Sequence, residues 1–253
     1  MKWASIGKTP YRLFNLLTRP LRKDPQKDEL TRINNETVDM LRELKGPKVL
    51  EIGSRNVSNV TRKHMFPNAS QYVGFDVLDG ENVDIVGDAH QLSEYIAENS
   101  VDIVYSVSVF EHLMFPWKAA LEINKVLKTG GHVMVSTHPA WPEHEMPWDF
   151  WRFPQNSFLA MFNQTTGFKV KHVVEGRAMR AFPLFSDKPM RRMYRHKLNG
   201  SVFCLAQKIC DYDKDKLKWD MKIENVVDTM YPPKRWGPKS RFLNIDGWNH
   251  EHV

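Results

Sequence analysis

Lys48-Val-Leu-Glu-Ile-Gly-Ser54 is the stretch that predicts the fold of this chain, because it reads as a short buried strand followed by a tight turn. A short apolar run that stops at a glycine is typical of a parallel strand where it enters a turn. A second such run, Tyr72-Val-Gly-Phe-Asp76, ends in an aspartate. In nucleotide-binding α/β folds, a carboxylate at this point holds a ribose. The two runs together predict an adenosine-type cofactor.

Strand-like and helical segments alternate along the chain, as expected of an α/β protein with a parallel sheet. With 253 residues, of which 42% are hydrophobic, the chain can bury a full core as one domain. Strands are expected at Lys48–Ile52, Gln71–Asp76, Val83–Val86, Val101–Ser106, His132–Thr137, Phe168–Val174 and Ser201–Ile209. Helices are expected at Thr31–Leu44, part of Asn56–Met65, Leu92–Glu98, Pro116–Leu127 and Gln155–Asn163.

The turn after the first strand indicates which kind of cofactor fits. A dinucleotide needs the pattern G-x-G-x-x-G, so that the backbone approaches a pyrophosphate closely. Here the loop reads Gly53-Ser-Arg-Asn-Val-Ser58, with one glycine only, which argues against NAD or FAD. S-adenosylmethionine has no phosphates and needs no such cradle. The segment Val86-Gly-Asp88-Ala-His90 adds an acid suited to accept a hydrogen bond from an adenine amino group.

Two further motifs complete an ordered set. Val104-Tyr-Ser-Val-Ser-Val-Phe-Glu-His-Leu113 follows the fourth strand, and Asn124-Lys-Val-Leu-Lys-Thr-Gly-Gly131 precedes the fifth. With these motifs, the chain resembles the class I S-adenosylmethionine-dependent methyltransferases of the group called methyltransferase type 11, over about residues 46–175. The resemblance implies an enzyme of the EC 2.1.1 class. It also implies a Rossmann-like three-layer α/β sandwich with a mostly parallel seven-stranded sheet and an antiparallel last strand.

The resemblance also implies which residues contact the cofactor. Asp76 would hold the ribose hydroxyls, Asp88 and Ala89 would flank the adenine, and Ser106 would face the methionine part. The family's first loop usually carries a second or third glycine, whereas this loop has Ser54, Arg55 and Asn56. Arg55 could contact the methionine carboxylate. Asp76 alone could instead cap a turn. Glu51 could orient loop amides as well as contact the cofactor. The full set of cofactor-binding candidates is Glu51, Gly53, Ser54, Arg55, Asp76, Val77, Asp88, Ala89, Ser106 and Phe110.

The loop after the fifth strand carries the candidates for catalysis. Methyl transfer to a hydroxyl needs an aligned nucleophile and a base that takes its proton. Because unperturbed histidine titrates near pH 6.5, it can be a neutral base at working pH. The base candidates are His144, His138 and His112. His112 could instead pack or hold a turn, and His138 could make a structural hydrogen bond.

Other residues of this loop are candidates for binding the acceptor. Trp148, Asp149 and Arg152 would contact it, although Asp149 and Arg152 could equally brace the loop as an ion pair. No metal is expected, because the sequence has neither an HExxH motif nor paired cysteines. Moreover, the fourth strand ends in Ser106 and Ser108, where metal-dependent catechol-type methyltransferases use acids.

Positive charge is concentrated in two segments of a chain whose net charge is +6. Residues 177–199 hold seven Lys or Arg and one acid, and residues 1–30 hold seven and three. A cluster of one sign at a cleft attracts anionic substrates, so Arg180 is a further candidate for binding the acceptor. The N-terminal stretch Tyr11-Arg-Leu-Phe-Asn-Leu-Leu17 is expected to be a lid, with peripheral membrane contact as the alternative.

These observations give an overall prediction. We expect an N-terminal helical lid or extension at 1–45, a methyltransferase domain at 46–210 with a basic insertion at 177–199, and a C-terminal tail at 211–253. Cys204 and Cys210 lie too far apart along one strand for a disulfide, which favours a reducing cytoplasm. No nucleic-acid partner is expected, because no RNA-binding module accompanies the basic cluster. A homo-oligomer is left open.

The predicted reaction is O-methylation of a sugar, glycan or related polar acceptor, neutral or anionic, with a histidine base. The alternatives are N- or C-methylation of a small metabolite or lipid, and a regulatory protein that binds S-adenosylmethionine without turnover.

Overall fold

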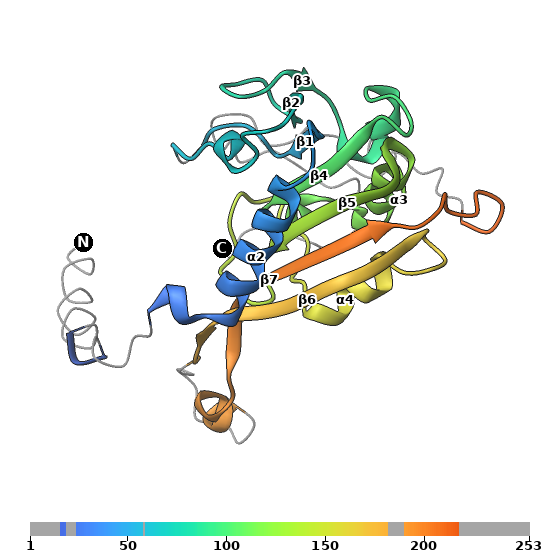
Figure 1. Ribbon diagram of the computed structural model, residues 1–253. Coiled ribbons are helices and arrows are strands. Elements are labelled where there is room, and N and C mark those ends of the chain that lie inside the picture. Colours follow the sequence, from blue (N-terminus) through green and yellow to red (C-terminus); the bar gives the residue numbers. More distant parts are fainter. Residues whose placement is uncertain (1–15, 19–23, 58, 182–189, 218–253) are drawn as a thin grey trace, which may run out of the picture.

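The computed structural model of the protein describes residues 16–18, 24–57, 59–181 and 190–217 (Figure 1). Its centre is a seven-stranded sheet in the order β3-β2-β1-β4-β5-β7-β6. Strands β1 to β5 pair in parallel, whereas β7 runs antiparallel to both β5 and β6. The strands are β1 (Lys48–Ile52), β2 (Gln71–Asp76), β3 (Ile85–Val86), β4 (Val101–Val107), β5 (Leu127–Thr137), β6 (Phe168–Met179) and β7 (Leu198–Lys208).

Helices cover both faces of the sheet, so the protein has three layers. Helix α2 (Glu29–Arg42) packs on one face, near β6 and β7 (Figure 1). The opposite face is covered by α3 (Pro116–Val126), α4 (Gln155–Met161) and the 3-10 helix η4 (Ala89–Glu94). Successive strand residues point to opposite faces, and the inner strands therefore fill two cores. In β4, Ile103 and Tyr105 join the α2 side, and Val104 joins the other.

Asp28 fixes helix α2 to the sheet. One of its carboxylate oxygens caps the helix by accepting a hydrogen bond from Leu30 N at 3.1 Å. The other accepts from Arg177 N, near the end of β6, at 2.9 Å. The helix then buries Leu30, Val38 and Leu41 against the strands. A single side chain thus joins the start of α2 to the far edge of the sheet.

The predicted fold class is confirmed, and β1 and β2 have the predicted bounds. The helix predicted within part of Asn56–Met65 is wrong, because the described residues of that segment form the 3-10 turn η3 (Lys63–Met65) and not a longer helix. That segment is rich in Asn, Ser, Thr and Val, which favour helices weakly. The helix expected at Leu92–Glu98 is η4 instead.

Strands β5, β6 and β7 differ most from the predicted bounds, whereas β4 is one residue longer than predicted and β3 is two residues shorter. Strand β5 begins at Leu127, before the Gly130-Gly131 pair, and runs through it. Strands β6 and β7 are longer than expected because their pairing continues to Met179 and Leu198. They therefore take up both ends of the expected basic insertion, and the 3-10 helix η6 (Met190–Arg195) follows between them.

Some predictions fall outside the described residues. These include most of the N-terminal segment before Asp24, positions 182–189 of the basic segment and the tail after Leu217. Across the part of the chain that the structure describes, no helix is both long and apolar enough to cross a membrane. Cys204 is buried, Cys210 is exposed, and both are free thiols.

Candidate active site

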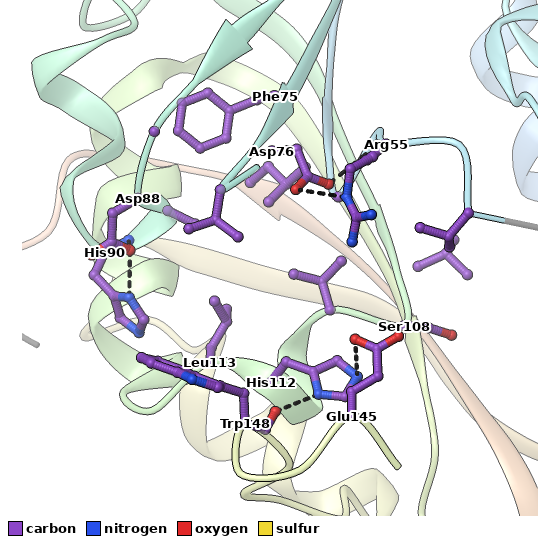
Figure 2. Close-up of a pocket in the computed structure, with 18 of the residues that line it drawn as sticks. Arg55, Phe75, Asp76, Asp88, His90, Ser108, His112, Leu113, Glu145 and Trp148 are labelled. Carbon is purple, nitrogen blue, oxygen red and sulfur yellow. Dashed lines mark hydrogen bonds and ion pairs between the residues drawn. The ribbon is translucent and has the colours of Figure 1, made fainter. Parts of the chain in front are cut away.

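A cavity of ≈ 580 Å³ lies at the carboxyl ends of the parallel strands (Figure 2). Each of five strands contributes a residue at or just after its end: Gly53, Asp76, Asp88, Ser108 and His138. Open α/β sheets bind ligands at this edge, where the strand order reverses, which here is between β1 and β4. We call the part formed by Gly53, Arg55, Asp76 and Asp88 the strand-end half of the cavity, and the part formed by Ser108, His112, His138, Trp141 and His144 the loop half.

Gly53 forms the first turn of the strand-end half. Its φ of 81° lies in the left-handed region, and a Cβ atom there would stand 2.1 Å from Val109 Cγ2. The amides of Gly53 and Ser54 both donate to the carbonyl of Phe75, at 2.8 and 3.2 Å. This turn therefore requires a glycine, and it holds the end of β1 against the end of β2.

Asp76 points into the cavity from the end of β2. Its Oδ1 accepts from Leu78 N at 3.0 Å, and its Oδ2 accepts from Arg55 N at 3.2 Å. An ionised carboxylate has about four lone-pair sites, so two remain for further donors such as the two ribose hydroxyls. The Arg55 Nε lies 3.7 Å from Asp76 Oδ1, and it is buried without a hydrogen-bond partner. A carboxylate of a bound ligand would satisfy this donor.

Asp88 occupies the opposite wall of the strand-end half. Its Oδ1 accepts from His90 N at 2.9 Å and from His90 Nδ1 at 2.6 Å. Burial alone would raise the pKa of Asp88, but the hydrogen bonds from His90 outweigh burial and hold this pKa below its ordinary value. Asp88 is therefore an ionised acceptor at neutral pH, next to the apolar side chains of Phe75 and Leu113.

Four of the expected cofactor contacts do not line the cavity. Glu51 accepts from Tyr72 Oη at 2.8 Å and lies 3.4 Å from Arg62 Nη1, while burial raises its pKa. Ser54 and Ser106 are buried, and their hydroxyls have no hydrogen-bond partner. Phe110 belongs to the core. The expected contacts that do line the cavity are Gly53, Arg55, Asp76, Val77, Asp88 and Ala89.

All three histidine candidates line the loop half of the cavity. His138 places Nδ1 2.9 Å from the carbonyl oxygen of Gly200 and Nε2 3.3 Å from Ser108 Oγ. His112 places Nδ1 2.5 Å from the carbonyl oxygen of Trp148. The rings of His112 and His144 are in contact, with centroids 4.7 Å apart. The structure thus brings together three histidines from two separate segments of the chain.

Asp149 and Arg152 form an ion pair that braces the loop, and neither lines the cavity. Arg152 also donates to the carbonyl oxygens of Trp141 and Pro142, each at 3.0 Å. Burial alone would raise the pKa of Asp149, but the hydrogen bonds from Arg152 and from His144 N hold it below its ordinary value. Trp148 does line the cavity, whereas Arg180 donates to the carbonyl oxygens of Tyr194 and Arg195 outside it.

The residues of this site that were not predicted include Glu111, Ser108, Trp141 and Arg62. Glu111 is fully buried, and its Oε1 lies 3.6 Å from His138 Nε2. Ser108, Trp141 and Arg62 line the cavity. Glu111 directly precedes the candidate base His112, and this position in the sequence could have indicated that Glu111 belongs to the site. Nothing in the local sequence marks Arg62, because it reaches the cavity from a segment that was expected to be helical.

Comparison with known proteins agrees with this geometry. Residues 50–135 match the family described as Methyltransferase domain. A search of the curated proteins finds no match. Among solved structures, the YcgJ protein from Bacillus subtilis is similar in fold, with a TM-score of 0.51 and 15% identity over 70% of this chain and 98% of that chain. A second is 1,6-didemethyltoxoflavin-N1-methyltransferase from Burkholderia thailandensis, with a TM-score of 0.50 and 9% identity over 83% and 90%.

The match over residues 50–135, together with the fold, supports a class I S-adenosylmethionine-dependent methyltransferase. The strand-end half fits that cofactor: Asp76 has acceptor capacity for a ribose, Asp88 accepts beside an apolar wall, and Arg55 Nε lacks an acceptor. When bound, S-adenosylmethionine supplies an electrophilic methyl group on its sulfonium. What the protein must add is an acceptor atom held in line and freed of its proton.

Proposed function

We propose that the enzyme methylates a hydroxyl of a sugar or a related polar acceptor, with His138 as the general base. The observation that carries this proposal is the orientation of the His138 ring. Its Nδ1 faces the carbonyl oxygen of Gly200, and a carbonyl only accepts, so Nδ1 carries the proton. In the neutral ring, Nε2 then holds the lone pair, on the side of Ser108 and the cavity. A lone pair at this position is what removal of a hydroxyl proton requires.

Two neighbours support His138 in this role. Glu111 lies 3.6 Å from Nε2 and would stabilise the positive charge that His138 gains with the proton. Thr137 Oγ1 donates to the other oxygen of this carboxylate and thereby holds it in place. Trp141 stacks on the His138 ring, with centroids 4.7 Å apart and planes 19° apart. The ring is thus fixed from three directions.

The walls of the loop half suit a sugar-like acceptor. Trp141 lines the cavity and is 49% exposed, so its indole offers a flat apolar face to the C–H side of a sugar ring. Arg62 also lines the cavity, and together with Arg55 it brings positive charge there. An acceptor with a phosphate or carboxylate group would be attracted by these charges. The loop half thus offers polar side chains such as Ser108 and His138 to the hydroxyls of a sugar, and the indole of Trp141 to its apolar face.

Transfer of a ¹³C-labelled methyl group tests this proposal directly. Nucleotide-sugars and oligosaccharides are incubated with the enzyme and labelled cofactor, and the product is examined by carbon NMR. A labelled methyl carbon bonded to oxygen supports the proposal. A methyl carbon bonded to nitrogen or carbon, on any acceptor that is turned over, would overturn the assignment of the acceptor atom and of the base.

A further inference from the structure

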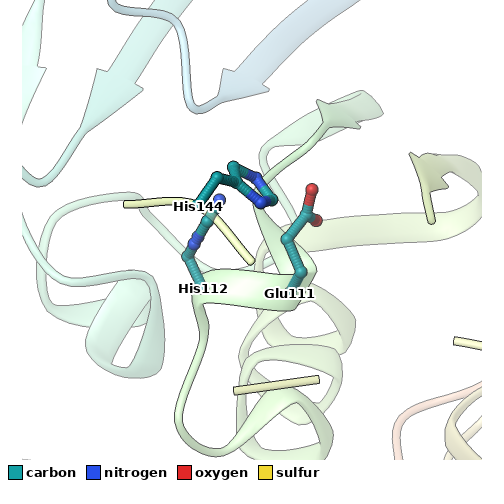
Figure 3. A group of neighbouring side chains, drawn as sticks. All are labelled: Glu111, His112 and His144. Carbon is teal, nitrogen blue, oxygen red and sulfur yellow. The ribbon is translucent and has the colours of Figure 1, made fainter. Parts of the chain in front are cut away.

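The loop half contains a second arrangement, in which Glu111, His112 and His144 converge. Figure 3 shows the three side chains pointing toward one another from η5 (Phe110–His112) and from the loop that follows β5. One potential ligand atom from each lies within 4.8 Å of the other two. Two imidazoles and one carboxylate are the protein ligands of a well-known type of catalytic zinc site.

The histidine rings are held as metal ligands are held. His112 Nδ1 faces the carbonyl oxygen of Trp148 at 2.5 Å, and His144 Nδ1 faces that of Pro142 at 3.1 Å. Because carbonyls only accept, both rings carry their proton on Nδ1, and Nε2 is the atom with the lone pair. Histidines that bind metals almost always donate their other ring N–H to a carbonyl or carboxylate in this way.

His90 shows the contrasting case of a structural histidine. Its Nδ1 faces Asp88 Oδ1 at 2.6 Å, but its Nε2 accepts a hydrogen bond from Phe115 N at 3.1 Å. Both ring nitrogens are therefore engaged by this chain's own atoms. At His112, by comparison, Nε2 lies 4.0 Å from a carboxylate oxygen of Glu145, which is a fourth acidic or imidazole group beside Glu111, His112 and His144. Binding a metal through Nε2 would cost His90 its backbone hydrogen bond from Phe115 N.

Glu111 provides an independent argument for a bound cation. The residue is 0% exposed, and its Oε1 is buried with no hydrogen-bond partner. Among the described residues, the group that forms an ion pair with it is His138 at 3.6 Å, which is charged only when protonated. A buried carboxylate without a compensating cation is costly, so such groups pair with cations or coordinate metals.

We propose that Glu111, His112 and His144 bind a divalent metal ion with the preferences of zinc. Ligand bonds of about 2.0–2.2 Å would require the three atoms to close up by roughly 1 Å. His144 can make this adjustment, because its side chain is 29% exposed and lies on a loop. The spacing of these residues along the chain hid the site, since the ligands come from two distant segments.

The remaining coordination position would face the cavity, next to His138. An acceptor hydroxyl bound there would lose its proton more readily, because a divalent ion stabilises the alkoxide. This role rests on the proposed function, but binding of the ion does not.

The test is a calorimetric titration of Zn²⁺ into the full chain, without a polyhistidine tag and after treatment with a chelator. We expect one equivalent of Zn²⁺ to bind, with at least tenfold weaker affinity in Glu111→Gln and His144→Ala. The control is His172→Ala, which removes an exposed histidine of β6 that does not line this cavity. Co²⁺ in place of Zn²⁺ should give visible absorption bands in the wild type that are absent in His144→Ala. Thermal unfolding of each variant confirms that it is folded.

The outcomes separate this inference from the proposed function. Absence of stoichiometric Zn²⁺ binding, or equal binding by wild type and both folded variants, would overturn the metal site and leave O-methylation standing. Specific Zn²⁺ binding by an enzyme that methylates only nitrogen or carbon would support the metal site and overturn the proposed function.

Discussion

The two halves of the cavity are built in different ways. The strand-end half consists of single residues at the ends of neighbouring strands, and its geometry follows from the backbone: Gly53 and Ser54 donate to one carbonyl, and Asp76 accepts from two amides. The loop half consists mainly of one loop folded onto η5, and its geometry follows from side chains. For example, the single side chain of Arg152 donates to the Asp149 carboxylate and to the carbonyl oxygens of Trp141 and Pro142. The backbone thus fixes the first half, whereas a side-chain network holds the second.

This difference leads to an expectation about variants. Changes in the strand-end half should weaken cofactor binding, and changes in the loop half should slow turnover while cofactor binding persists. Three predictions test this separation and a fourth tests the ion pair that braces the loop half, in order of decreasing effect.

The first prediction concerns the base. His138→Gln should lower kcat by roughly 10²- to 10⁴-fold, the usual contribution of a general base. Affinity for S-adenosylmethionine should stay unchanged, because His138 lies in the loop half. Initial rates with the best acceptor measure this effect, and His172→Gln, at an exposed position of β6, is the control. Full activity of the His138 variant would show that another group takes the proton.

The second prediction compares two glycines that both have positive φ. Gly53→Ala adds backbone strain of about 1–2 kcal/mol and overlap with Val109 of about 1–3 kcal/mol. The sum is about 2–5 kcal/mol, and where this cost falls on the cofactor-bound form of the turn, binding weakens by about 30-fold or more. Gly130, with φ of 88°, has open space where a Cβ would stand, so Gly130→Ala should leave cofactor affinity unchanged. Calorimetry measures both affinities. If Gly53→Ala and Gly130→Ala lose the same cofactor affinity, the overlap with Val109 is not what makes Gly53 necessary.

The third prediction concerns the charge at the end of β2. Asp76→Asn keeps the shape but replaces charge-assisted hydrogen bonds by neutral ones, at a cost of about 1–1.5 kcal/mol. Cofactor affinity should therefore fall roughly tenfold. Asp102→Asn is the matched control, because Asp102 lies near the start of β4 and bonds Lys48 N and Lys128 Nζ. If Asp76→Asn binds the cofactor as tightly as the wild type, Asp76 does not contact the ribose.

The fourth prediction concerns acid stability of the loop. The pKa of Asp149 is held below its ordinary value, so its ion pair stabilises the protein above that ordinary value, near 3.9. This contribution is lost as the pH falls through the lower pKa of the folded state. Asp149→Asn should therefore lower Tm at pH 7 by roughly 3–6 °C, from about 1.5 kcal/mol for hydrogen bonds to a charged group.

At acid pH the difference between Asp149→Asn and the wild type should shrink, because the wild type then loses the same ion pair. Thermal unfolding of both proteins from pH 7 down to pH 3 measures this difference in Tm. A gap in Tm that stays constant over this range would show that Asp149 is not the group that titrates.

The same contrast explains what the sequence could predict. β1 and β2 have the predicted bounds, and the cavity contains Gly53, Asp76 and Asp88, because strand ends leave a local pattern of apolar runs, glycine and acid. The loop half left weaker signals. His138, His144 and Trp148 were expected in the site, and the Asp149–Arg152 ion pair was one of two expected roles, because the two residues are three positions apart. The burial of Glu111 and its approach to His138 depend on how the loop folds onto η5. That contact joins residues that are distant in sequence, and no local pattern records it.

The most direct test of this account is a side-by-side calorimetric titration of S-adenosylmethionine into Asp76→Asn and His138→Gln. We predict that Asp76→Asn binds roughly tenfold more weakly than the wild type. His138→Gln should bind the cofactor as the wild type does, while it loses methyl transfer. If both variants lose cofactor affinity to the same extent, or if neither does, the separation of the cavity into a strand-end half for the cofactor and a loop half for the acceptor is contradicted.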